Sequence, residues 1–151
     1  MIKFGKLFGN IGDRLARDNV KIGNVYFIPL DERNGITPKD GDTSRNKFFI
    51  VLGFDADGNV VGGVVINSNI NHRLPSIVTD YYLPITVEQC PFLKHNSYVN
   101  CSVIIVTEID KFTNGSYRGE ISDPKLMRSI IDTMKESPTV IEQQMDDFGI
   151  K

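Results

Sequence analysis

Arg45 is the residue of this chain best suited to phosphate chemistry. It lies in the stretch GDTSRNKFFIVLGF, residues 41–54, between a polar, turn-rich segment and an apolar run. A guanidinium carries a planar fork of donors that can bind two phosphate oxygens and stabilise the charge of a phosphorane. The alternative is an ordinary arginine that flanks a strand in solvent.

Asn67 and Ser68 form a second candidate site, where the next apolar run ends. An amide and a hydroxyl at this point can hydrogen-bond a phosphate or the edge of a base. The stretch NSNIN, residues 67–71, is equally typical of an Asx-rich turn that closes a strand. The residues alone leave both interpretations open.

Further side chains can assemble a basic rim around Arg45. These candidate RNA-binding residues are Lys39, Lys47, Arg73, Lys94, His72 and His95. The acidic Asp40 and Asp42 share a loop with Lys39, and a loop of mixed charge is often simply solvated. A pair of histidines can also act as acid and base on RNA. Nothing in the sequence brings the two histidines together, and each can equally be an ordinary surface residue.

The composition limits the kinds of partner. The chain has 151 residues, which suits one domain, and its net charge is −2. Residues 1–137 contain 16 basic and 16 acidic residues, so the acidic excess lies in residues 138–151. A neutral body gives no bulk attraction to nucleic acid, so RNA binding would need a local basic patch.

No cofactor and no metal are expected. Cys90 and Cys101 do not have metal-type spacing, and no glycine-rich phosphate motif with its lysine is present. Two thiols in a chain of this size fit a reducing cytosol, which favours a cytoplasmic location. We expect neither a signal peptide nor a membrane span.

The hydropathy pattern predicts a mainly β domain with flanking helices. Gly62 and Gly63 fall inside one of the predicted strands, which indicates a bulge or a sharp bend, as in a small, strongly bent barrel. Strands are expected at 24–30, 47–54, 59–67, 78–86 and 97–109, a short helix or turn at 8–19, and helices at about 123–136 and 138–149. The barrel is expected to span about residues 22–112 of a single domain, 1–151.

The order of several segments resembles the PemK/MazF-like family of toxins. They are KIGNVYFIPL, SRNKFFIVLG, GNVVGGVVINS and SYVNCSVIIVTEIDKF…GEISDPKLMRSIIDTM, and together they cover about residues 22–135. The resemblance implies an SH3-like barrel of about five strands with a C-terminal helix, usually a homodimer. It also implies a toxin that cleaves single-stranded RNA without a metal and is neutralised by an antitoxin protein.

The resemblance assigns roles to the first candidates. Arg45 would stabilise the phosphorane, while Asn67 and Ser68 would position the scissile phosphate. The sequence departs from the family in three places: Asn67 replaces a threonine, Asn46 replaces a proline, and the stretch NCS at 100–102 lacks an acidic residue. The general base is not identified.

Two alternatives remain open at this stage. The barrel can be a non-catalytic module that binds a protein or a nucleic acid through the same groove. The C-terminal segment, which carries Val140, Ile141, Met145 and Phe148 beside three acidic residues, can pack on its own barrel or lie across a basic groove.

Overall fold

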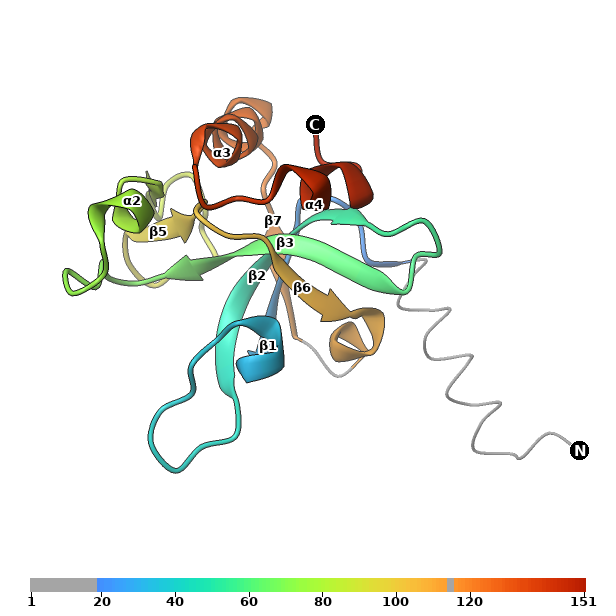
Figure 1. Ribbon diagram of the computed structural model, residues 1–151, viewed down its shortest axis with the longest axis horizontal. Helices are drawn as coiled ribbons and strands as arrows, with labels where there is room; N and C mark the ends of the chain where they lie inside the picture. The colour runs from blue at the N-terminus through green and yellow to red at the C-terminus, as the bar shows by residue number, and fades with distance from the viewer. Residues whose placement is uncertain (1–18, 114–115) are drawn as a thin grey trace, which may run out of the picture.

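The chain folds mainly into β structure. The computed structural model describes residues 19–113 and 116–151, and Figure 1 shows their arrangement. The expected short helix or turn at 8–19 lies outside these residues, apart from Asn19. Seven strands are present: β1 (Asn24–Leu30), β2 (Arg45–Phe54), β3 (Val60–Asn67), β4 (Tyr82–Ile85), β5 (Ser97–Asn100), β6 (Ile105–Glu108) and β7 (Ser116–Glu120).

The strands form one antiparallel sheet with β3 near its centre. The sheet runs in the order β4-β5-β3-β2-β1-β7. One end of β3 pairs with β5, while its other end, Val60–Gly63, pairs with β6. Among the described residues no ladder joins β7 to β4 or β6, so hydrogen bonding does not close the sheet.

Both faces of the central strands are buried. Successive side chains of a strand point to opposite faces, and here they enter two separate clusters. Ile50 and Val64 belong to the cluster that includes the C-terminal helices, while Phe49 and Val65 belong to the cluster that includes Phe112. This explains why the β2 sequence is a continuous apolar run rather than an alternating one.

Gly62 and Gly63 allow side chains to pack directly on the backbone of β3. A Cβ at Gly63 would lie 2.1 Å from the carbonyl oxygen of Ile50, and one at Gly62 would lie 2.7 Å from the Phe148 ring. The bulge indicated by these glycines falls on the partner strand. The β2–β3 register shifts between Val51 and Gly53, so Leu52 is the extra residue.

The strand predicted at 97–109 is wrong as a single element, because it breaks into β5 and β6. The Asn100 side chain accepts hydrogen bonds from the backbone N–H and the hydroxyl of Ser102, which makes an Asx-type turn. The Cys101 N–H donates to the carbonyl of Tyr81, in register with the β4–β5 ladder, and the chain then turns before β6 pairs with the other end of β3. A local side-chain bond therefore outweighs the strand propensity of the apolar run.

Other sequence predictions also need correction. The segment 78–86 divides into a short helix, α2 (Ser76–Thr79), and β4. Strand β7 is a further difference, and together with the division of 97–109 into β5 and β6 it raises the predicted total of about five strands to seven among the described residues. The exposed, charged sequence SYRGE lacks the apolar alternation of a half-buried strand, which is why pattern analysis missed it.

The C-terminal helices cover one face of the sheet (Figure 1). Helix α3 (Pro124–Glu136) begins at Asp123, whose side chain accepts from the Lys125 N–H, and it buries Leu126, Ile130 and Met134. These features match the predicted helix. Helix α4 (Glu142–Asp147) is shorter than the expected 138–149. Met145 and Phe148 are buried in the same cluster, so this segment packs on its own sheet.

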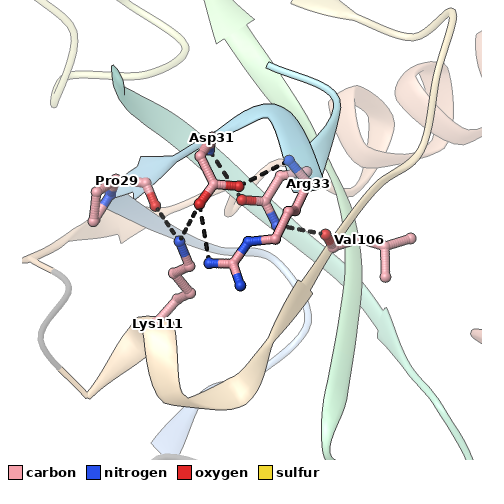
Figure 2. A network of polar contacts seen from close by, with 6 residues as sticks. Pro29, Asp31, Arg33, Val106 and Lys111 are labelled. Carbon is pink, nitrogen blue, oxygen red and sulfur yellow. Dashed lines mark hydrogen bonds and ion pairs between the residues drawn. The ribbon is translucent and has the colours of Figure 1, made fainter. Parts of the chain in front are cut away.

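The long loop after β1 is fixed at its base (Figure 2). It starts with a short 3-10 helix, η1 (Glu32–Asn34), whose N-cap Asp31 binds both Arg33 and Lys111. The hydrogen bond from Arg33 lowers the pKa of Asp31, and burial partly offsets this. Lys111, in the second 3-10 helix, η2 (Ile109–Phe112), also donates to the Pro29 carbonyl, and Asn34 donates to the Val106 carbonyl. These contacts tie the end of β1 to β6 and η2.

We predict that Phe148→Ala will lower the free energy of unfolding by about 3 kcal/mol, because it removes a ring packed on Gly62. Ile141→Ala is the matched control in the same segment, since Ile141 is 58% exposed and its loss should cost less than about 0.5 kcal/mol. Urea unfolding of the two variants checks this. Equal stabilities would contradict the packing of the C-terminal segment on β3.

Candidate functional site

A hollow of about 330 Å³ opens between β1, the start of β2, the end of β3, β7 and the segment that leads into β5. We call it the aromatic hollow. It is lined by Phe27, Arg45, Asn46, Lys47, Phe48, Ile66, Ser68, Phe92, Leu93, Lys94, His95, Ser97 and Arg118. Its volume lies at the lower end of the range of small-ligand sites, roughly 300–1,000 Å³.

Three phenylalanine rings line the aromatic hollow. Phe27 and Phe48 are opposite each other in the β1–β2 ladder, and their ring centroids are 4.9 Å apart. The Phe48 and Phe92 centroids are 5.8 Å apart. All three side chains are only partly buried, so they present apolar surface to an occupant. Partly exposed rings of this kind can stack on the bases of single-stranded nucleic acid.

A strand irregularity places Arg118 over the Phe27 ring. The β1–β7 register shifts between Val25 and Tyr26, which leaves Arg118 as the extra residue of β7. Such bulges re-aim a side chain, and here the Arg118 guanidinium carbon lies 5.1 Å from the Phe27 ring centroid. A cation over an aromatic face is stabilised by the ring quadrupole. The backbone at Gly119 also leaves room for Phe92.

The charged side chains that line the aromatic hollow are positive. Its lining includes four cationic side chains and a histidine, and none of the described residues that line it is an aspartate or a glutamate. The cationic residues are Arg45, Lys47, Lys94 and Arg118. The local field therefore favours an anion, although the chain as a whole is slightly acidic.

A second hollow of about 310 Å³ adjoins the first. We call it the asparagine hollow. It is lined by Arg45, Lys47, Asn67, Ser68, Asn69, Ile70, Asn71 and Tyr82. Arg45, Lys47 and Ser68 line both hollows, so they stand where the two meet.

Asn67 holds Lys47 at this meeting point. The two residues flank the Phe48–Ile66 pair of the β2–β3 ladder, and the Lys47 ammonium donates to the Asn67 side-chain oxygen. Asn67 also hydrogen-bonds the Tyr82 hydroxyl. Burial, with a smaller contribution from the nearby Arg45 charge, lowers the pKa of Lys47 to about 8. Lys47 is thus a positioned cation that releases its proton more readily than an exposed lysine.

His95 lies in the aromatic hollow with a fixed ring nitrogen. Its Nδ1 is 3.1 Å from the carbonyl oxygen of Asn96, a contact in which Nδ1 carries the proton and donates. Nε2 is then the acceptor of a neutral imidazole and can take a proton from a bound molecule. The chain around it is held by Ser97, whose hydroxyl donates to the His95 carbonyl.

The structure brings together some of the predicted site residues and not others. Arg45, Lys47, Ser68, Lys94 and His95 line the aromatic hollow, and Asn67 lies in the adjoining one. The remaining three, Lys39, His72 and Arg73, are exposed and line neither hollow.

Sequence reasoning missed the aromatic part of the site. Phe27 and Phe48 fall in predicted strands, and Phe92 and Arg118 lie outside the strands and helices that the sequence predicts. A pair of phenylalanines at facing positions of neighbouring strands was the available signal. It becomes informative only with the strand register and with the Arg118 bulge.

Other kinds of site find little support in the described residues. Within residues 19–113 and 116–151, no group of three or more metal-ligating side chains occurs, and no helix there is long and apolar enough to cross a membrane. Cys90 and Cys101 are buried, and burial raises the pKa of the Cys101 thiol to about 12. A thiol in that environment is a core side chain rather than a nucleophile.

Comparisons of the sequence with models of protein families and with curated proteins gave no match. The PemK/MazF-like resemblance therefore rests on the residues quoted above.

We predict that Lys47 makes stability depend on pH. Its folded-state pKa, about 8, is below the ordinary value of 10.5, so the unfolded state binds more protons between these values. The free energy of unfolding should therefore rise with pH from about 8 upward, at no more than about 1.4 kcal/mol per pH unit. Urea unfolding at several pH values should show this rise in the wild type relative to Lys47→Met. Lys39→Met, a change at an exposed lysine, should leave the wild-type slope intact, and an equal slope in Lys47→Met would contradict the assignment.

Proposed function

We propose that this protein binds single-stranded RNA and cleaves it as a metal-independent endoribonuclease. The observation that carries the proposal is the aromatic hollow, where three partly exposed phenylalanines lie beside four cations with no carboxylate among the lining residues. Stacking surfaces combined with cations are what single-stranded nucleic acid requires. These cations also form the local basic patch that RNA binding needs in a chain whose residues 1–137 carry no net charge.

The residues supply each part of a phosphodiester cleavage. Arg45 binds the scissile phosphate and stabilises the charge of the phosphorane. His95 Nε2 takes the proton of the ribose 2′-hydroxyl, whose oxygen forms a bond to phosphorus while the bond to the 5′-oxygen breaks. The Lys47 ammonium protonates the leaving 5′-oxygen. The products are a 2′,3′-cyclic phosphate and a 5′-hydroxyl, and proton exchange with water restores both groups.

Asn67 and Ser68 have different tasks in this scheme. The amide of Asn67 is engaged with Lys47 and Tyr82, so Asn67 is a positioning residue for the acid. Ser68 is exposed and lines both hollows, which supports a role for its hydroxyl in binding the phosphate. Lys94 and Arg118 bind the phosphates of the RNA next to the scissile phosphate.

The proposal extends to the PemK/MazF-like relationship. In that scheme the sheet corresponds to an SH3-like barrel, two copies form a dimer, and an antitoxin protein neutralises the toxin in the cytoplasm. The order of the quoted segments supports it. Strand β3 pairs with β2 along one edge and with β5 and β6 at its two ends, and a strand shared in this way is consistent with a small barrel.

A binding module without catalysis is the second candidate. It is favoured by the stretch NCS at 100–102, which has no acidic residue where some family members carry one. The Asn100 side chain is committed to the turn at Ser102. RNA that binds without being cut would support this alternative.

We predict that Arg45→Ala will reduce cleavage of a single-stranded RNA by at least about 100-fold, the effect of removing one charge-stabilising donor. Arg73→Ala is the matched control, because Arg73 is an exposed arginine outside both hollows, and its activity should stay near the wild-type rate. Gel analysis of the products and thermal unfolding check both variants. Cleavage that survives in a folded Arg45→Ala protein would overturn the site assignment.

We predict that His95→Gln will separate cleavage from binding. Loss of the general base should slow cleavage by about 100- to 10,000-fold, while fluorescence anisotropy should show RNA affinity within a few fold of the wild type. Unchanged cleavage would show that His95 is not the base.

A further inference from the structure

We propose that the asparagine hollow is a second nucleotide subsite, in which Asn69 reads the edge of one RNA base. This inference rests on the proposed function and deepens it, since it makes the site selective for sequence. The class of ligand is a single-stranded RNA step of two nucleotides, one in each hollow.

The first argument is continuity. A single phosphate separates neighbouring nucleosides in RNA, and the residues shared by the two hollows include Arg45 and Lys47. A phosphate bound there carries one nucleoside into the aromatic hollow and the next into the asparagine hollow. The two volumes, about 330 and 310 Å³, are similar, as expected of two units of the same polymer.

The second argument is strand geometry. Phe48 and Ile66 are paired across the β2–β3 ladder, and Lys47 and Asn67 are the adjacent residues, so their side chains point to the opposite face. The two hollows therefore lie around the end of this ladder. An RNA strand that passes this end turns its phosphate toward the cations and its two bases toward different surfaces.

The third argument concerns the amides. Asn67 is committed to Lys47 and Tyr82, and the Asn71 side-chain oxygen accepts from the Arg73 N–H. Asn69 is exposed, and within the part of the chain that the structure describes its side chain forms no hydrogen bond. A carboxamide presents a donor beside an acceptor, which pairs with the donor–acceptor edge of an unstacked base.

Tyr82 completes the subsite. Its ring lines the asparagine hollow and is partly buried, and its hydroxyl is held by Asn67. The ring offers a surface on which the base read by Asn69 can stack.

The test uses the full chain and 2′-O-methyl tetranucleotides, which bind without being cut. Each position of a uridine tetramer is replaced in turn by each other base, and affinity is measured by fluorescence anisotropy. The wild type should prefer one base at one position by about 5- to 100-fold, the range of a good bidentate pair. Asn69→Ala should abolish the preference at that position and leave affinity for the uridine tetramer within a few fold.

Two control variants separate the possible outcomes. Asn59→Ala, at an exposed asparagine outside both hollows, should keep the preference, while Arg45→Ala should weaken all the RNAs alike. A wild type without any preference, or a preference that Asn69→Ala retains, would overturn this inference and leave the proposed function standing. If no RNA bound the wild type, both the second nucleotide subsite and the proposed function would be overturned.

Discussion

The absence of side chains at Gly62 and Gly63 is the constraint on which this structure depends. Strand β3 is the only described strand that pairs with three others, and it passes between two apolar clusters. Phe49 packs on it at Gly63 and Phe148 at Gly62, at distances that no Cβ would permit. These contacts allow one strand to belong to both cores and to bend between β5 and β6.

The far end of the same hairpin carries the candidate site. Regular pairing of Phe48 with Ile66 sets Lys47 and Asn67 within hydrogen-bonding reach of each other. Burial of Lys47 at this position, with a smaller contribution from the Arg45 charge, lowers its pKa. The packing of the core and the chemistry of the site are therefore coupled through the register of one ladder.

The site also shows how a slightly acidic protein can attract an anion. The acidic residues 142, 146 and 147 lie in the C-terminal segment, which packs over the glycines of β2 and β3. The cations gather from the start of β2, the segment before β5 and the middle of β7, which are three separate parts of the sequence. Net charge therefore says little about the field in a particular hollow.

The sequence by itself determined the local elements, which are β1, the β2–β3 hairpin and the capped helix α3, and it singled out Arg45 as a candidate. These follow from apolar runs, turn residues and capping, which act between neighbours in the chain. Only the tertiary structure decided the break at Asn100, the strand β7 and the site residues Phe27, Phe92 and Arg118. Strand register and a bulge create those features, and both depend on contacts between residues far apart in the sequence.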